Sequence, residues 1–282
     1  MNNRTTLVCM LVVGNAEPLS SIAFQSIRNR FSGVVLIGHI SKSDVAFSEQ
    51  DPNVEYLDLS SKLHFEEDTY RGFQDPSFYQ IVKLKWELII HALSMGFDNV
   101  IYTDLDLLWL RDAADTIERT FQKFTSIEIL IQSFTRGTEL PCLCMGFVAL
   151  KVNKRNQEFV ELCQRTHENI AVKNPMIGDD EVVSQVFQDL NYPSWIRELP
   201  QSTFPTGNIY PLYIKHLRFR KMARVHPYVF HLNYVVGIEN KLLLLVYLKY
   251  FAFLKIDSIN IITQLKIFIR ILRKKILTTK QI

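Results

Sequence analysis

Apolar residues occur in two patterns along this chain, short runs and runs with helical spacing. Together these patterns predict alternating strands and helices over its first 240 residues. Short apolar runs predict strands, and runs with helical spacing predict helices. The expected strands are residues 7–13, 34–40, 53–59, 99–103, 127–134, 144–150, 195–199 and 226–234. The expected helices are residues 19–30, 78–95, 113–124, 156–171 and 179–190. This order begins β-α-β and predicts an α/β domain with a mixed, Rossmann-like sheet flanked by helices.

The helix predicted over residues 78–95 carries a lysine on its apolar side. Apolar residues recur at helical spacing from Ile81 to Ala92, and Lys85 falls inside their stripe. Two interpretations stay open. Either the stem of Lys85 lies along the border of the stripe with its ammonium group in solvent, or the ammonium group faces a phosphate or the acids of the next strand.

Two carboxylates interrupt the apolar stretch of residues 99–110. If residues 99–103 form a buried strand, alternation places Asp104 and Asp106 on one face at its end, with Leu105 opposite. Buried carboxylates are costly unless a cation or strong donors compensate them, and Mg²⁺ and Mn²⁺ prefer oxygen ligands. The pair therefore predicts a divalent metal site at the carboxyl end of a strand, where open α/β sheets bind ligands.

Three acids, Asp179, Asp180 and Glu181, open the helix predicted over residues 179–190. The helix dipole and capping favour acids in a first turn, so a simple cap is one interpretation. Three acids in succession exceed what capping needs. The second interpretation places some of them in a functional site.

A second group of polar residues follows the last predicted strand. Alternation puts His231 and Asn233 on one face, and Gly237 and Lys241 follow within ten residues. A lone histidine is more often structural than a ligand. Here, however, a glycine and a lysine follow, as expected where backbone and ammonium group approach an anion together. The strand predicted over residues 144–150 also contains a glycine, Gly146, which indicates the close approach of another group.

The last 42 residues differ from the rest in charge. They hold nine Lys or Arg against one acid, whereas the whole chain has 32 against 29, so the tail carries +8 and the rest −5. This asymmetry argues against nucleic acid as a partner of the body. Residues 242–254 are apolar but too short for a membrane span. Residues 261–276 combine an apolar face with basic residues, which is typical of a helix on an anionic membrane surface; packing against the core is the alternative.

We therefore expect a domain over residues 1–240 and a basic amphipathic appendage over residues 241–282, of which residues 242–282 bind an anionic membrane. The four cysteines lack the spacing of a zinc knuckle. The apolar run at residues 7–13 lacks the small-residue cleavage site of a signal peptide. We expect a cytoplasmic protein, peripheral on the inner face of a membrane.

Several short motifs occur in a distinctive order between residues 75 and 241. They are Lys85, Gly96, the acidic stretch 104–112, Met145-Gly146-Phe147, Asp180-Glu181, Phe204-Pro205-Thr206-Gly207 and His231-x-Asn233-Tyr234-x-x-Gly237-x-x-x-Lys241. This order resembles the nucleotide-diphospho-sugar transferase family that includes plant rhamnogalacturonan xylosyltransferases. The resemblance implies a GT-A fold that binds a nucleotide-diphosphate sugar through Mn²⁺ or Mg²⁺.

The resemblance also implies a role for each motif. Asp106 would bind the metal directly, Asp104 would lie near the metal and the ribose, and His231 would complete the metal coordination. The residues that would face the diphosphate are Lys241, Gly237 and Lys85. Asp180 would lie near the sugar and the acceptor. Glu181 stands where the family has Gln, and Asp179 precedes the pair. Front-side displacement and a covalent intermediate on Asp180 or Asp179 both stay open.

The expected function is metal-dependent transfer of a sugar, with retention, from a UDP-sugar to a glycan or other hydroxyl acceptor. One alternative is a non-catalytic, membrane-associated protein that keeps the sugar-nucleotide fold. Another is a phosphatase with an Asp-x-Asp nucleophile. Phosphatases of that class carry Thr or Val two residues after the second Asp, where this chain has Leu108. Their Asp-x-Asp pair also lies on the first strand, whereas Asp104 and Asp106 follow about a hundred residues.

Overall fold

The structure is a computed structural model. It describes residues 5–14, 16–62, 76–134, 142–207, 227–233 and 235–251, with the side chains at 76–78 and 247–251 left out. Over these residues, no helix combines the length and the apolar character that crossing a membrane requires.

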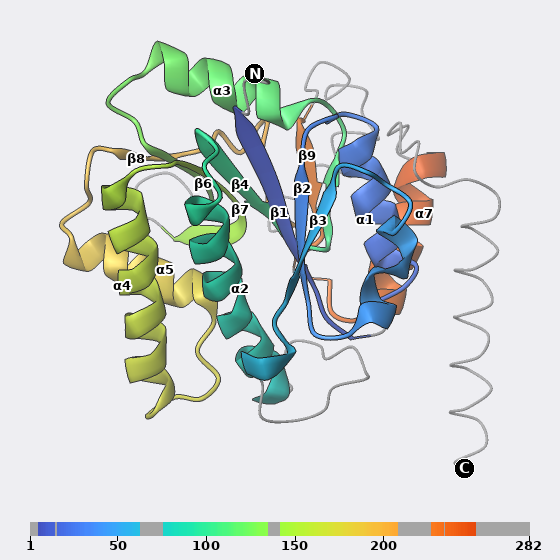
Figure 1. The fold of residues 1–282 in the computed structure, drawn as a ribbon, viewed down its shortest axis with the longest axis horizontal. Helices are drawn as coiled ribbons and strands as arrows, with labels where there is room; N and C mark the ends of the chain where they lie inside the picture. Colours follow the sequence, from blue (N-terminus) through green and yellow to red (C-terminus); the bar gives the residue numbers. More distant parts are fainter. Residues whose placement is uncertain are drawn as a thin grey trace.

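Within the described residues, seven strands form one mixed sheet at the centre of the domain (Figure 1). They are β1 (Thr6–Val12), β2 (Val35–His39), β3 (Val54–Asp58), β4 (Asn99–Thr103), β6 (Ile129–Ser133), β7 (Leu143–Lys151) and β8 (Ile196–Glu198). Their order is β3-β2-β1-β4-β7-β6-β8. The first four are parallel, β7 is antiparallel to both of its neighbours, and β8 is parallel to β6. The apolar runs lie in the central strands because these are covered on both faces.

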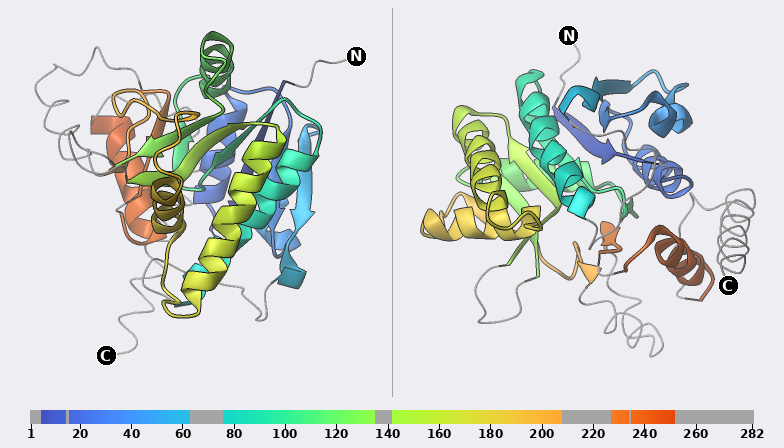
Figure 2. Two further views of the ribbon diagram at one scale, coloured as in Figure 1. Left: turned by 90° about the vertical axis from the view of Figure 1, so that its left-hand side faces the viewer. Right: turned by 90° about the horizontal axis from the view of Figure 1, so that it is seen from below.

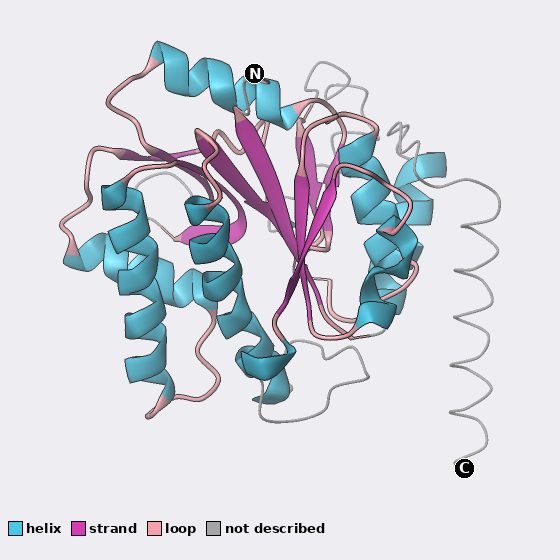
Figure 3. Cartoon of the chain, viewed as in Figure 1, coloured by secondary structure: helices cyan, strands magenta, loops and turns pink. Residues whose placement is uncertain are grey.

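Helices cover both faces of this sheet. On one face, α2 (Pro76–Ser94) and α4 (Lys154–Ala171) lie side by side and α5 (Asp179–Asp189) packs with them (Figures 1 and 2). On the other face lie α1 (Leu19–Arg28) and α3 (Ala113–Lys123). Two 3₁₀ turns, η1 (Lys42–Ser48) and η2 (Ser60–Lys62), flank β3. The central sheet is thus the middle of three layers (Figure 3).

A second, two-stranded sheet completes the fold. It pairs β5 (Leu107–Trp109) with β9 (Val229–His231) in antiparallel register, so that Leu107 lies opposite His231. The helix α7 (Ile238–Phe251) follows β9. An apolar cluster joins the second sheet to α1 and α7; it contains Leu19, Ile22, Leu108, Phe230, Leu232, Ile238, Leu242 and Leu245. This cluster packs β9 and α7 against β5 and α1.

The predicted strands and helices are found, with ends that differ by a few residues, and two details need correction. Residues 104–106 form a turn rather than the continuation of β4, with Leu107 N donating to Asp104 O at 3.2 Å. The final strand is shorter than predicted, and residues 226 and 234 lie outside the described residues. Residue 240, where we expect the domain to end, lies inside α7, and Leu242 and Leu245 of this helix are fully buried. Residues 252–282, with the predicted surface helix, lie outside the described residues.

Candidate active site

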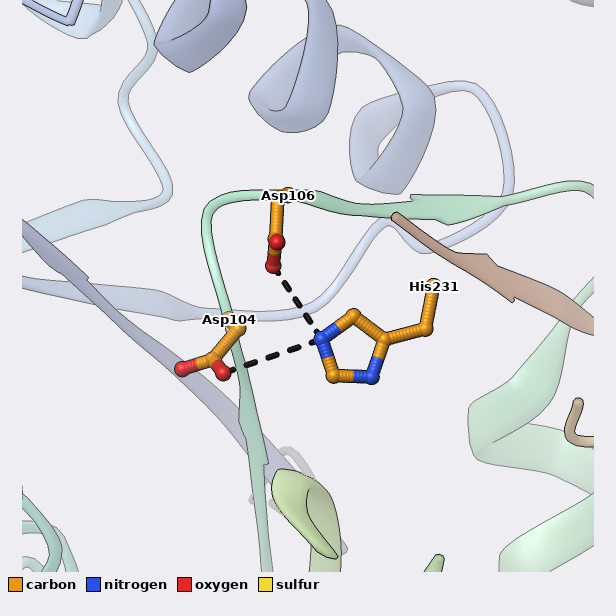
Figure 4. A group of neighbouring side chains, drawn as sticks. All are labelled: Asp104, Asp106 and His231. Atoms are coloured by element: carbon orange, nitrogen blue, oxygen red, sulfur yellow. Dashed lines mark hydrogen bonds and ion pairs between the residues drawn. The ribbon is translucent and has the colours of Figure 1, made fainter. Parts of the chain in front are cut away.

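Two acids and a histidine from distant parts of the chain converge at the carboxyl end of β4 (Figure 4). His231 Nε2 lies 3.1 Å from Asp106 Oδ1 and 3.8 Å from Asp104 Oδ2. The ligand atoms of the three residues all lie within 4.8 Å of one another. The pairing of β5 with β9 creates this arrangement, because Leu232 N donates to Asp106 O at 2.9 Å. The predicted trio therefore comes together, through a turn and a second sheet rather than strand alternation alone.

An irregularity in the central sheet makes room for the histidine ring. The β6–β7 register jumps between Ile131, opposite Val148, and Gln132, opposite Cys144. A Cβ on Gly146, inside this gap, would lie 1.9 Å from His231 Cε1. The close approach indicated by this glycine is thus the approach of the imidazole, and the bulge re-aims groups at a site as bulges often do.

Two lysines neutralise the acids. Lys241 Nζ lies 2.6 Å from Asp106 Oδ2, and Lys85 Nζ lies 2.9 Å from Asp104 Oδ1 and also binds Asp179. Burial acts to raise the pKa of Asp106, but Lys241 and His231 outweigh it and hold that pKa well below its usual range. Burial acts to lower the pKa of Lys85, but Asp104 and Asp179 raise it well above its usual value. Of the two interpretations of Lys85, the one that faces it toward acids is confirmed.

Asp104 divides its two oxygens between different partners. Tyr102 donates its hydroxyl to Oδ1 at 2.8 Å, and the Lys85 ammonium binds the same oxygen. This leaves Oδ2 as the oxygen nearer to His231 Nε2 (Figure 4). Tyr102 was not among the residues predicted from the sequence, because a tyrosine in an apolar strand reads as core.

The three acids at the start of α5 do different things. Glu181 accepts from Gly178 N at 2.6 Å and so caps the helix. Asp179 binds Lys85, and Asp180 Oδ1 accepts from Met145 N at 2.6 Å. Burial and the neighbouring charge of Asp179 raise the pKa of Asp180 well above its usual value. The capping interpretation therefore holds for Glu181, whereas the place of Asp179 and Asp180 in a functional site stays a prediction.

The segment around β9 is fastened to the turn at residues 200–207. Gly207 N donates to Asn233 Oδ1 at 2.5 Å, and a Cβ on Gly207 would lie 1.9 Å from Asn233 O. Gly237 has a φ of +88°, a conformation that favours glycine. It lies directly before α7, the helix that carries Lys241 to the acids. The structure thus gives Gly237 a part in shaping this turn, and its contact with a diphosphate stays a prediction.

The side chains fit a divalent cation. Two carboxylates and an imidazole nitrogen can surround a single ion at the spacing observed, and this mixed oxygen and nitrogen set suits Mn²⁺ and Mg²⁺ better than a soft metal. The backbone at Gly146 leaves a cradle that only a glycine allows. The site is therefore compatible with the predicted metal.

A model of the nucleotide-diphospho-sugar transferase family matches residues 42–245. The chain belongs to this family. The match includes every predicted site residue from Lys85 to Lys241 and begins earlier in the chain than the resemblance found by motif. The assignment to the nucleotide-sugar glycosyltransferases is thereby confirmed as a class.

Relatives and a solved structure agree with this family. UDP-D-xylose:L-fucose alpha-1,3-D-xylosyltransferase 3 of Arabidopsis thaliana is 24% identical over 184 residues, which are 60% of this chain and 46% of the relative. UDP-galactose:fucoside alpha-3-galactosyltransferase of Dictyostelium discoideum is 23% identical over 237 residues, 75% of this chain and 33% of the relative. The chain thus spans half or less of the length of these relatives. Mouse xyloside xylosyltransferase 1 in its apo form superposes with a TM-score of 0.54 at 12% identity, over 81% of this chain and 98% of that one. The GT-A fold predicted for this family member is confirmed.

Proposed function

We propose that the chain transfers a sugar from a UDP-sugar to a hydroxyl group of a glycan, with a divalent cation, Mn²⁺ or Mg²⁺, bound by Asp104, Asp106 and His231. The observation that carries this proposal is the convergence of these three side chains with two lysines at the end of β4. In open α/β sheets this edge is where ligands bind. An arrangement of acids and ammonium groups around one point is also what a leaving diphosphate requires.

The charges of the site account for the need for a metal. Asp104, Asp106 and Asp179 in ionised form, with Lys85 and Lys241 as ammonium groups, leave a net charge of −1. Such a site repels a diphosphate. A divalent cation held by Asp104, Asp106 and His231 would change the net charge to +1 and would supply positive charge for the leaving diphosphate. Lys241, which binds Asp106 at 2.6 Å, is proposed to contact a phosphate oxygen of the donor as well.

Asp180 and Asp179 are proposed to lie beside the sugar and the acceptor. Asp179 is tied to Lys85, and the raised pKa of Asp180 favours its protonated form, which is a weak nucleophile. These properties favour front-side displacement over a covalent intermediate on either acid. Retention is the expected outcome, because the two relatives make alpha linkages and UDP-xylose and UDP-galactose carry their sugars in the α configuration.

The relatives suggest which substrates to test first. One is named for UDP-xylose with L-fucose and the other for UDP-galactose with a fucoside, so the two names share a fucose acceptor. The experiment is a panel of UDP-xylose, UDP-galactose and UDP-glucose with Mn²⁺ or Mg²⁺, with and without an aryl α-L-fucoside, following UDP release and product formation. A chelator should abolish the release of UDP.

Each failed result points to a different alternative. Binding of UDP-sugars without hydrolysis or transfer would favour a non-catalytic protein that keeps the fold. Release of phosphate from a simple phosphomonoester would favour the phosphatase. Full activity in the chelator would remove the metal from the proposal.

A membrane role for residues 242–282 is a separate proposal, supported by the charge of the tail, and so is a cytoplasmic location on the inner face of a membrane. The structure changes the design of the test. Truncation after residue 240 would remove Lys241 and the buried Leu242 and Leu245, so truncation after Phe251 is the informative variant. Reduced sedimentation with phosphatidylglycerol vesicles is expected, with UDP release unchanged. Unchanged sedimentation would contradict the proposal.

A further inference from the structure

A glutamine that no motif includes lies directly behind the metal site. Gln132 belongs to β6, is fully buried, and stands where the β6–β7 register jumps. Its Oε1 lies 3.1 Å from His231 Nδ1, the ring nitrogen that faces away from the acids. Its Nε2 donates to Phe204 O at 3.3 Å and to Pro205 O at 3.2 Å.

These contacts determine which way the amide points. The carbonyl oxygens of Phe204 and Pro205 can only accept hydrogen bonds, so the amide atom that faces them must be the NH₂ group. The reversed amide would set its oxygen against two carbonyl oxygens and its NH₂ group against the imidazole. The orientation is therefore fixed by hydrogen bonding, and Gln132 presents an acceptor to His231.

An acceptor at this position determines which nitrogen of His231 carries the proton. An amide oxygen cannot donate, so Nδ1 must hold a proton and donate to it. The Cys144 sulfur is 3.7 Å from the same nitrogen, so the oxygen at 3.1 Å is the stronger partner. With the proton held at Nδ1, the nitrogen available to a cation is Nε2, which lies beside Asp104 and Asp106.

We infer that Gln132 is a positioning residue of the metal site, which fixes the tautomer and the ring orientation of His231. The inference rests on the proposed function, because it takes His231 as a metal ligand. Residues that hydrogen-bond to a metal-binding histidine in this way contribute to metal affinity, and their loss weakens it about 10- to 100-fold.

The first test is a direct observation of the wild-type protein. In the full chain labelled with ¹⁵N-histidine, the His231 signals are assigned by comparison with His231→Gln, without metal and with Mg²⁺. We expect a proton on Nδ1 in both states. A His231 with an unprotonated Nδ1 would overturn the inference, and this measurement needs no variant of Gln132.

The second test compares two nearly isosteric substitutions. Gln132→Met removes the acceptor, whereas Asn156→Leu removes another fully buried amide that ties two backbone carbonyls, at 3.2 and 2.7 Å, away from the site. Mn²⁺ binding without nucleotide is measured from the amplitude of the electron paramagnetic resonance signal of free Mn²⁺. We expect the dissociation constant for Mn²⁺ to be about 10- to 100-fold larger in Gln132→Met and unchanged in Asn156→Leu.

The possible results separate the inference from the function on which it rests. Wild-type Mn²⁺ affinity in a folded Gln132→Met protein, or an equal loss in Asn156→Leu, would overturn the role of Gln132 and leave the metal site standing. An absence of Mn²⁺ binding in the wild type would overturn the metal site itself, and the role of Gln132 with it.

Discussion

Two fully buried histidines, His167 and His231, show how differently the same side chain is used in this molecule. His167 lies on α4, where Trp86 of α2 donates its indole N–H to His167 Nδ1 at 2.9 Å and the two rings meet edge to face. His231 lies on β9, where Nδ1 faces the amide oxygen of Gln132 and Nε2 faces two carboxylates. Nδ1 of His167 therefore accepts a hydrogen bond, whereas Nδ1 of His231 donates one.

The difference teaches that the hydrogen-bond partner, not burial, decides the role of a histidine. An indole can only donate, so Nδ1 of His167 is an acceptor and the ring is neutral. Burial lowers the pKa of His167 to about 4, which suits a residue that packs two helices together. At His231 the partners leave Nε2 facing acids, as a cation ligand requires. Four predictions test this contrast.

The largest effect is expected from Asp106→Asn. It removes one ligand charge beside His231 and Lys241, and a bound cation supplies several kcal/mol of charge stabilisation. We expect metal-dependent UDP release to fall at least about 1,000-fold while cooperative thermal unfolding persists. Asp115→Asn, at an exposed pair with Arg119, is the control and should keep full activity. Normal turnover in Asp106→Asn would contradict the metal site.

His167 is expected to make the stability of the fold depend strongly on pH over a defined range. The unfolded side chain has a pKa near 6.5 and the folded one near 4, so the unfolded state binds more protons between these values. The contribution to stability is present above pH 6.5 and is lost as the pH falls to 4. A gap of about 2.5 corresponds to about 3 kcal/mol.

The measurement is the free energy of unfolding by urea from pH 7 to pH 4. His167→Gln should lose less stability than the wild type over this range. His91→Gln, at an exposed histidine on α2, should follow the wild-type curve. Parallel curves for the wild type and His167→Gln would show that His167 is not held neutral.

A smaller effect on Mn²⁺ affinity is expected from a substitution at Gly146, beside His231, with a substitution at Gly38, in the apolar core, as the comparison. In Gly146→Ala the new Cβ would lie 1.9 Å from His231 Cε1, so the ring must move, and we expect Mn²⁺ affinity to fall about 10-fold. In Gly38→Ala the new Cβ would lie 3.1 Å from methyl groups of Leu59 and Leu88, so stability falls by about 1–3 kcal/mol and Mn²⁺ affinity stays unchanged. Calorimetry and Mn²⁺ titration distinguish these results. Equal Mn²⁺ affinity in both variants would mean that the ring is not held against Gly146.

The sequence predicted the features that depend on local pattern or on motif order. The strands and helices follow from apolar periodicity, and Asp104, Asp106 and His231 were expected to form one group because of the family resemblance. The buried side of Lys85 also followed from the helical wheel, although its partner Asp179 did not. These residues carry their chemistry in their own identity and spacing.

What the sequence missed depends on segments that meet only in the folded chain. Gln132 acts on His231 because of a register jump in the sheet and a turn at residues 204–205, and neither feature has a local signature. A glutamine within an apolar run was the available signal. The sequence also did not show that Leu242 and Leu245 are buried, because apolar residues of a final helix look alike whether they cover a core or a membrane.

The smallest effect is expected at Tyr102, which holds Asp104 as Gln132 holds His231. Tyr102→Phe removes the hydroxyl that donates to Asp104 Oδ1, but the ring under the Lys85 ammonium group remains, and Lys85 still binds the same oxygen. One lost hydrogen bond is worth about 1 kcal/mol, so Mn²⁺ affinity should fall about fivefold. Tyr56→Phe, which removes a hydroxyl contact with Ser48 at the edge strand β3, should leave it unchanged. An undiminished affinity in Tyr102→Phe would mean that Lys85 alone orients Asp104. A loss as large as that of Asp106→Asn would mean that the hydroxyl belongs to the set of groups around the cation.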